Sequence, residues 1–162
     1  TSARNPGDVI LSIGAVEFNI YGVKETAFYS RVDIATSILA GFTVEAETVK
    51  WWNEQKEQTI HESLNRDEAY PLRAVLEDFS RIVDKDTILW AKSPDFDCVL
   101  LKAAYDKLNI PVPWSFRNVR DVRTILALAG VTVLPVHNAL DDARRQAAAV
   151  IVAYQNLGAK LL

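Results

Sequence analysis

The chain has 162 residues, enough for one domain with a buried core. Apolar residues make up 49% and charged residues 24%, which is typical of a globular protein and not of a disordered one. The net charge of −3 argues against nucleic-acid binding driven by charge alone, although carboxylates that bind cations would still attract phosphate. Cys98 is the one cysteine, which excludes an internal disulfide, and no apolar run approaches the length of a membrane span. We therefore expect a single soluble domain over residues 1–162, in the cytoplasm.

The first part of the chain predicts a β-hairpin. Residues 9–18 form a nearly continuous apolar run, which indicates a strand buried on both faces. Tyr21-Gly22 is a turn signal, and residues 26–34 alternate in polarity and are rich in β-forming residues. A further short strand is expected at residues 87–91, between polar boundaries.

Capping residues and apolar spacing predict five helices. Thr43 is expected to cap a helix over residues 44–52, Pro71 to open one with apolar positions up to residue 83, and Ser93 to cap one that starts at Pro94. A short helix is expected at residues 124–129 and a long one at residues 140–157. The order of these elements predicts a mixed α/β fold without repeats or an internal linker.

Two acidic helix starts and one histidine are the candidates for chemistry. His137 lies on a loop before the last helix, and an unperturbed histidine, with a pKa of ~6.5, can accept a proton from water. Asp142 lies beside the apolar stripe of that helix and Asp97 lies on the inward side of an earlier one, so we assign both as metal ligands. Asp141 and Asp95 are expected to complement the helix dipoles only. The plainer interpretation of His137 is a structural histidine.

Several further segments accompany these residues, and together they carry a family resemblance. They are Ile10-Leu11-Ser12-Ile13-Gly14-Ala15-Val16, Phe28-Tyr29, Thr48-Val49-Lys50-Trp51-Trp52, Asp95-Phe96-Asp97, Arg120-Asp121-Val122-Arg123-Thr124 and His137-Asn138-Ala139-Leu140-Asp141-Asp142-Ala143. The chain resembles the DEDDh 3′–5′ exonucleases of the ribonuclease H-like superfamily. Within them it is most similar to the branch of bacterial and phage exoribonucleases and exodeoxyribonuclease VIII-like proteins.

The resemblance implies a ribonuclease H-like mixed β-sheet flanked by helices. It also implies that Asp97 and Asp142 bind the metal ions and that His137 is the general base. It also marks a departure, because the family's first motif, Asp-x-Glu on a central strand, would fall before Thr1 and is not in this sequence. We therefore expect a further segment upstream, of about one strand or ~5–10 residues.

Substrate contacts are expected from aromatic and cationic side chains. Trp51 and Trp52 are candidates for stacking on nucleobases, with core packing as the alternative for at least one of them. Arg120 and Arg123 are candidates for bidentate phosphate contacts, with pairing to Asp121 or glutamates as the alternative. Ser12, in the first of the segments that carry the resemblance, is also placed among the substrate-binding candidates.

The leading hypothesis is a metal-dependent 3′–5′ exonuclease that acts on the 3′ ends of single-stranded RNA or DNA. Two Mg²⁺ or Mn²⁺ ions, ~3.5–4 Å apart, would clamp the scissile phosphate. One rival is a degenerate, non-catalytic module of the same fold that binds nucleic acid or protein. A second rival keeps the enzyme class and changes the substrate to a small phosphodiester or a nucleotide. The sequence leaves the choice between DNA and RNA open, and it leaves a homodimer open as well.

Overall fold

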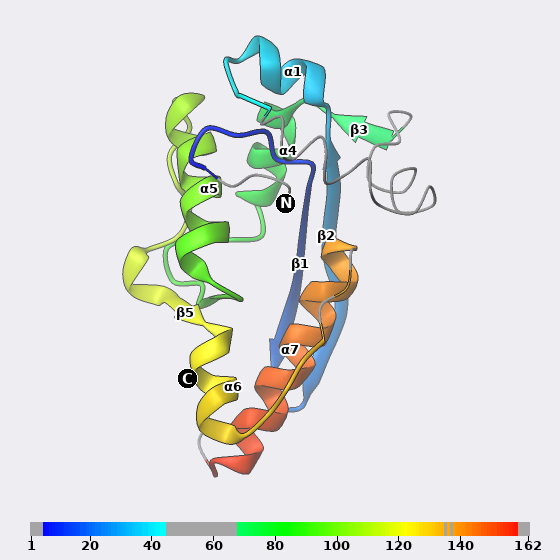
Figure 1. Cartoon of the computed structure of the whole chain (residues 1–162), viewed down its shortest axis with the longest axis vertical. Helices are drawn as coiled ribbons and strands as arrows, with labels where there is room; N and C mark the ends of the chain where they lie inside the picture. Colours follow the sequence, from blue (N-terminus) through cyan, green and yellow to red (C-terminus); the bar gives the residue numbers. More distant parts are fainter. Residues whose placement is uncertain (1–4, 45–67, 135, 137, 159–162) are drawn as a thin grey trace.

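The computed structural model describes residues 5–44, 68–134, 136 and 138–158 (Figure 1). Its elements, in chain order, are β1 (Ser12–Asn19), β2 (Gly22–Val32), α1 (Ile34–Leu39), β3 (Ala69–Tyr70), α4 (Leu72–Phe79), β4 (Leu89–Ala91), α5 (Pro94–Lys107), a 3-10 turn (Phe116–Asn118), β5 (Val119–Asp121), α6 (Val122–Ala129) and α7 (Ala139–Asn156). The predicted mixed α/β class is confirmed. No helix in the described part of the chain is both long and apolar enough to cross a membrane.

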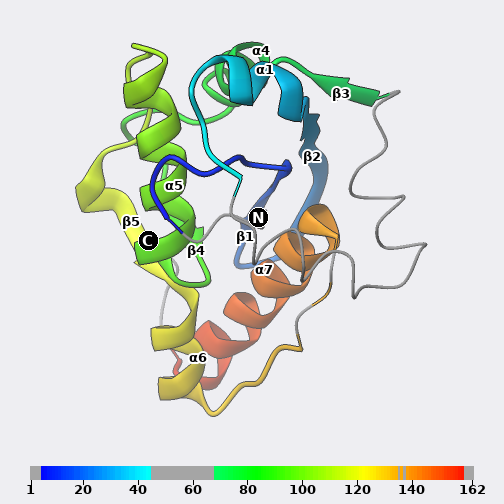
Figure 2. The same cartoon turned by 45° about the horizontal axis from the view of Figure 1, so that its top comes forward.

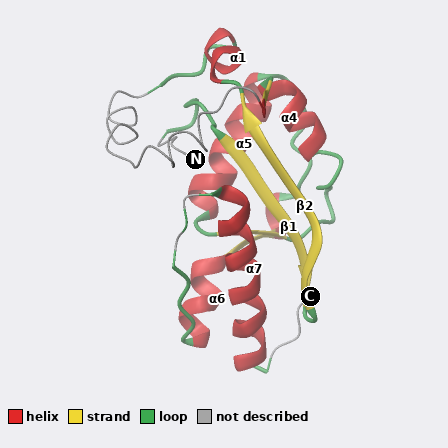
Figure 3. Ribbon diagram, turned by 90° about the vertical axis from the view of Figure 1, so that its right-hand side faces the viewer, coloured by secondary structure: helices red, strands yellow, loops and turns green. Residues whose placement is uncertain are grey.

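The predicted hairpin is confirmed as the antiparallel pair of β1 and β2, in which Ser12 pairs with Arg31 and Asn19 with Gly22. The expectation of a strand buried on both faces is wrong. The strand starts at Ser12, and Ile13 is its one fully buried residue, because the most deeply buried part of the apolar run, Val9–Leu11, precedes the strand. Helix α7 runs along the hairpin (Figure 3).

Two elements near the hairpin were not predicted. Ile34, expected to end a strand, is the first residue of α1, because the Asp33 carboxylate accepts a hydrogen bond from the Ala35 N–H (2.8 Å) and starts a helix there. Strand β3 has two residues and lies parallel to β2, so it is too short to leave a pattern in the sequence.

The helix expected over residues 44–52 lies, beyond Val44, outside the described residues. Thr43, the expected cap of that helix, instead contacts Asp8. Its hydroxyl donates to the Asp8 carboxylate (2.7 Å), and the two residues form an isolated parallel β-bridge. Thr43 therefore ties the start of the described chain to the segment after α1.

Strands β4 and β5 form a second, parallel sheet, in which Leu89 pairs with Val119 and Ala91 with Asp121. Strand β4 confirms the expected strand in shortened form, whereas β5 was not predicted because it is short and carries two charged residues. Helix α5 follows β4, and α6 follows β5. The starts of these two helices therefore meet at the carboxyl ends of two paired strands.

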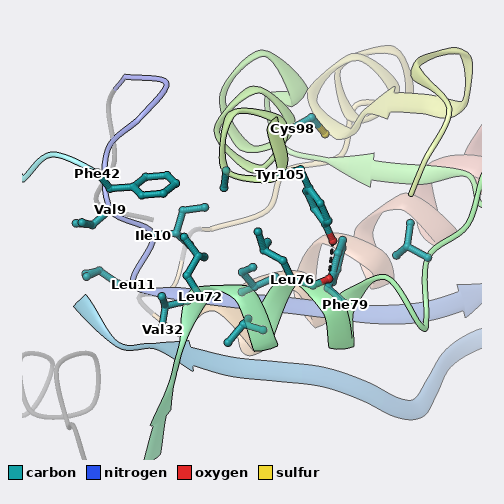
Figure 4. Close-up of a cluster of buried hydrophobic side chains, with 14 of the residues drawn as sticks. Val9, Ile10, Leu11, Val32, Phe42, Leu72, Leu76, Phe79, Cys98 and Tyr105 are labelled. Atoms are coloured by element: carbon teal, nitrogen blue, oxygen red, sulfur yellow. Dashed lines mark hydrogen bonds between the residues drawn. The ribbon is translucent and has the colours of Figure 1, made fainter. Parts of the chain in front are cut away.

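One hydrophobic cluster joins the segment before β1 to α4 and α5 (Figure 4). The predicted apolar positions Leu72, Val75, Leu76 and Phe79 are all buried, as is Val83, whereas Ile82 is exposed. The buried Tyr105 of α5 donates its hydroxyl to the Leu76 carbonyl (2.8 Å), so its one polar group is satisfied. This cluster fixes the body of α5 against α4.

A second cluster fixes α6 against α7, and the two helices lie side by side (Figure 2). Val122 and Leu126 of α6 face Ala149, Val150 and Ala153 of α7. The predicted inward stripe of α7 is confirmed at Ala147, Val150 and Ile151.

Candidate functional site

Asp97 and Asp142 occupy equivalent positions on two different helices. Each lies four residues after the N-cap of its helix, which is Ser93 for α5 and Asn138 for α7. In each case the aspartate N–H donates to the carbonyl oxygen of the cap residue, at 3.1 Å for Asp97 and 2.9 Å for Asp142. Both carboxylates therefore lie in the first turn of a helix, where the helix dipole favours negative charge.

The start of α7 is held by its own cap and by a glycine on β1. The Asn138 side-chain oxygen accepts hydrogen bonds from the N–H groups of Leu140 (2.9 Å) and Asp141 (3.1 Å). A Cβ atom at Gly14 would lie 2.5 Å from the Ala139 carbonyl carbon and 2.6 Å from the Leu140 nitrogen. Only glycine lets the strand approach the helix start this closely.

The Asp142 carboxylate is oriented by two donors. Gln146, one turn later on α7, donates its side-chain N–H to Oδ2 at 2.5 Å, and the Val136 N–H lies 3.4 Å from Oδ1. Asp141 beside it is exposed and lies 3.9 Å from Arg144, on the solvent side of the helix. Asp142 is thus the less exposed of the two neighbouring aspartates.

The Asp97 carboxylate is half-buried, and no described residue donates a hydrogen bond to it, whereas Asp95 is exposed. Burial raises the pKa of Asp97, and the negative charge of Asp142 raises that pKa further. The positive charge of Arg123 lowers it. The structure therefore places Asp142 of α7 and Arg123 of α6 close enough to Asp97 of α5 for their charges to act on its carboxylate.

Ser93 caps α5 differently from the way predicted. It occupies the N-cap position, but its side chain makes no capping hydrogen bond, and its backbone is left-handed, with φ of 85°. Its hydroxyl oxygen is shielded from solvent and has no partner within the described residues. The N–H of Ser93 instead lies 3.4 Å from the carboxylate of Asp121, the last residue of β5.

The expected substrate-binding residues lie on several different elements, unlike the two aspartates in the first turns of α5 and α7. Ser12 is the half-buried first residue of β1. The guanidinium group of Arg120 donates to the carbonyl oxygens of Arg117 (2.7 Å) and Val119 (3.0 Å), and it forms no ion pair with a carboxylate among the described residues. Arg123 is exposed, and its guanidinium group has no ion-pair partner in the described part of the chain. His137, Trp51 and Trp52 lie outside the described residues.

A divalent cation fits the carboxylate pair. Carboxylate oxygens are the preferred ligands of Mg²⁺ and Mn²⁺, and Mg²⁺ keeps several waters, so one or two protein carboxylates suffice. Asp97 is a half-buried acid that receives no hydrogen bond from the described residues, and the negative charge of Asp142 acts on it, an arrangement that a cation between the two would relieve. Among the described residues no group of three potential ligands is gathered, so the pair stands alone there.

Three residues of this region were not assigned a role from the sequence. In the sequence, Gly14 is only part of a motif. The requirement for glycine at this position follows from the close contact of its backbone with Ala139, which the structure shows. Asn138 and Asp121 carry a recognisable signal, a capping side chain directly before a helix, which the sequence pattern alone already contains. What the sequence does not contain is the contact of Asp121 with Ser93, 28 residues away.

The fold is mixed α/β, and two of its helices each carry an aspartate in the first turn. The chain belongs to the Rv2179c-like family: the model of the 3′–5′ exoribonuclease Rv2179c-like domain matches residues 1–154. Among curated proteins none matches the chain. The family accounts for the 3′–5′ exoribonuclease part of the expected resemblance and indicates a nucleic-acid substrate.

Proposed function

We propose that this chain is a metal-dependent 3′–5′ exoribonuclease in which Asp97 and Asp142 bind Mg²⁺ or Mn²⁺. Family membership supports the reaction and favours RNA over DNA, a choice that the sequence left open. The observation that carries the metal site is the pairing of Asp97 and Asp142, which occupy equivalent positions on α5 and α7 and repel each other.

The residues around the pair have separable roles in this proposal. Asp97 and Asp142 hold the cations, two of them if the site follows the DEDDh arrangement, and Gln146 keeps the Asp142 carboxylate oriented through its hydrogen bond. When bound, the cations supply positive charge beside the scissile phosphate and make a water molecule easier to deprotonate. Arg123, an exposed cation next to the pair, binds phosphate of the substrate.

His137 is the proposed general base. It accepts a proton from the water that attacks the terminal phosphodiester, the bond from phosphorus to the 3′-oxygen of the preceding nucleotide breaks, and a nucleoside 5′-monophosphate leaves. Its two neighbours in the sequence support this role, because Val136 lies against the Asp142 carboxylate and Asn138 caps α7. Ser12, Trp51 and Trp52 remain proposed contacts to the RNA strand, and the ribonuclease H-like, DEDDh assignment remains part of the proposal.

Digestion of 5′-labelled single-stranded RNA and DNA of one sequence, in Mg²⁺, Mn²⁺ or EDTA, tests the reaction. The chain is expected to shorten RNA stepwise from the 3′ end in either metal and to leave it intact in EDTA. A length series down to dinucleotides separates this activity from hydrolysis of small phosphodiesters. Binding of RNA without release of mononucleotide in Mn²⁺ would instead support a non-catalytic module of the same fold.

Four isosteric variants test the assignment of ligands. Asp97→Asn and Asp142→Asn are each expected to lower kcat by more than about 10²-fold, because even residues that only support a metal ligand cost ~10–100-fold. Asp95→Asn and Asp141→Asn are the matched controls, since each removes the same charge from an exposed neighbour on the same helix. They are expected to retain activity within about threefold. Equal losses in a ligand variant and its neighbour would contradict the assignment.

A further inference from the structure

We infer that Asp121 is a positioning residue for Asp97, and that it acts through Ser93. This inference rests on the proposed function, because it concerns how one of the proposed metal ligands is held in place. The structure contains a short chain of hydrogen bonds between the two aspartates. The Asp121 carboxylate accepts from the Ser93 N–H (3.4 Å), and the Ser93 carbonyl accepts from the Asp97 N–H (3.1 Å).

Asp121 is well placed to act as a fixed anchor. It ends β5, where it is paired with Ala91 at the end of β4, and it caps α6. One carboxylate oxygen accepts from the Arg123 N–H (2.9 Å) and the other from the Thr124 hydroxyl (3.2 Å). Because a strand pair and a helix start both fix this carboxylate, it can in turn fix a neighbour.

Ser93 is the residue that needs to be fixed. A non-glycine residue with φ of 85° is strained, and such a conformation persists only where the surrounding structure imposes it. The Ser93 side chain does not help, since its hydroxyl has no partner among the described residues. The Asp121 carboxylate, which accepts from the Ser93 N–H, therefore holds the backbone of Ser93 at the point where α5 leaves β4.

The consequence falls on Asp97 because of its place in the helix. Its backbone donates to the Ser93 carbonyl, so a change in the Ser93 conformation moves Asp97 before any other metal ligand. The second proposed ligand, Asp142, is held by a separate cap and is not affected by this route. Loss of the Asp121 contact should therefore weaken cation binding without unfolding the domain.

Asp121→Ser separates the two tasks of Asp121 in the full-length protein. Serine is a good N-cap, so α6 keeps its start, but its side chain is too short to reach the Ser93 N–H. Asp33→Ser is the matched control, because Asp33 caps α1 in the same way (2.8 Å to the Ala35 N–H) and no metal-ligand candidate lies on that helix. Asp121→Ser is expected to weaken Mn²⁺ binding, measured by calorimetry without RNA, by about 10–100-fold, and Asp33→Ser to leave it unchanged.

Ser93→Gly supplies a readout that a general loss of stability would not change. Glycine adopts a left-handed conformation without strain, so it does not need the Asp121 contact to stay there. In the Ser93→Gly background, Asp121→Ser is therefore expected to change Mn²⁺ affinity by no more than about twofold, the scatter expected of independent sites. An equal loss of Mn²⁺ affinity in both backgrounds would overturn the inference.

Hydrogen exchange at residues 93–97 keeps this test apart from the test of the proposed function. Asp121→Ser is expected to speed amide exchange at Ser93 and Asp97. Adding Ser93→Gly to Asp121→Ser should restore the protection of the Asp97 amide, and Asp33→Ser should leave both amides unchanged. Unchanged exchange in Asp121→Ser would overturn the inference even if the protein is an active nuclease. Conversely, a wild-type protein that degrades no RNA in Mn²⁺ would contradict the proposed function, and the exchange pattern would still decide the role of Asp121.

Discussion

Helices α5 and α7 present the two candidate metal ligands in the same register, yet their first turns are held in opposite ways. Asn138 caps α7 with its own side chain, which accepts hydrogen bonds from the N–H groups of Leu140 and Asp141. Ser93 occupies the cap position of α5 with a strained backbone and a side chain that makes no capping hydrogen bond, and it relies on Asp121 from strand β5. One ligand is thus positioned by local sequence and the other by tertiary structure.

This difference predicts how each ligand responds to mutation. Substitutions near α7 should act through the stability of the helix start and its packing against β1. Substitutions near α5 should act through the position of Asp97, with smaller effects on folding.

The largest effect on stability is expected from Gly14→Ala. The new Cβ would lie 2.5 Å from the Ala139 backbone, which cannot move aside as a flexible side chain can. We expect a loss of about 3 kcal/mol in the free energy of unfolding, near the upper end for overpacking, measured by urea denaturation. Ala27→Val adds carbon atoms at an exposed position of β2 and should cost little. Equal stability of the two variants would show that α7 does not pack as closely on β1 as described.

Asn138→Ala is expected to have an intermediate effect. It removes the acceptor for two backbone N–H groups at the start of α7 and should lower the free energy of unfolding by about 1 kcal/mol. Asn138→Ser keeps a capping oxygen and should recover most of this loss in the same urea titration. Failure of serine to recover it would mean that the role of Asn138 is not capping.

Ser93→Ala is expected to have the smallest effect, although Ser93 occupies the same cap position. Its hydroxyl is shielded and has no partner in the described residues, so removing it takes away an unsatisfied polar group and no hydrogen bond. The free energy of unfolding should stay within about 0.5 kcal/mol of wild type or rise. A loss as large as that of Asn138→Ala would reveal a capping bond that the structure lacks.

Local signals in the sequence were sufficient to predict most of the longer helices and strands. The hairpin, α4, β4 and α7 follow from apolar spacing and turn residues, and the preference for Asp97 over Asp95 and for Asp142 over Asp141 follows from helix periodicity, in agreement with their burial. Strands β3 and β5 could not be predicted, because two or three residues do not set up an alternating pattern. The dependence of α5 on Asp121 could not be predicted either, because it arises from the pairing of β4 with β5.

The raised pKa of Asp97 makes the stability of the metal-free protein depend on pH. Burial and the charge of Asp142 raise its folded-state pKa above the unfolded value, so the ionised form is disfavoured in the fold. The associated stability is fully present below the unfolded-state pKa of ~3.9 and is lost as pH rises through the folded-state pKa. In EDTA, Asp97→Asn should therefore be more stable than wild type at neutral pH, and the difference should fade as the pH falls toward 4.

The proposed metal site requires Asp97 and Asp142 to lie close together, and a double-mutant cycle measures the coupling free energy between their charges. The free energy of unfolding is determined by urea denaturation in EDTA at neutral pH for wild type, Asp97→Asn, Asp142→Asn and the double variant. Because the two charges repel each other, Asp97→Asn should stabilise the wild-type background more than it stabilises the Asp142→Asn background. Strict additivity of the two substitutions would contradict the account, because it would mean that the two carboxylates do not share a site.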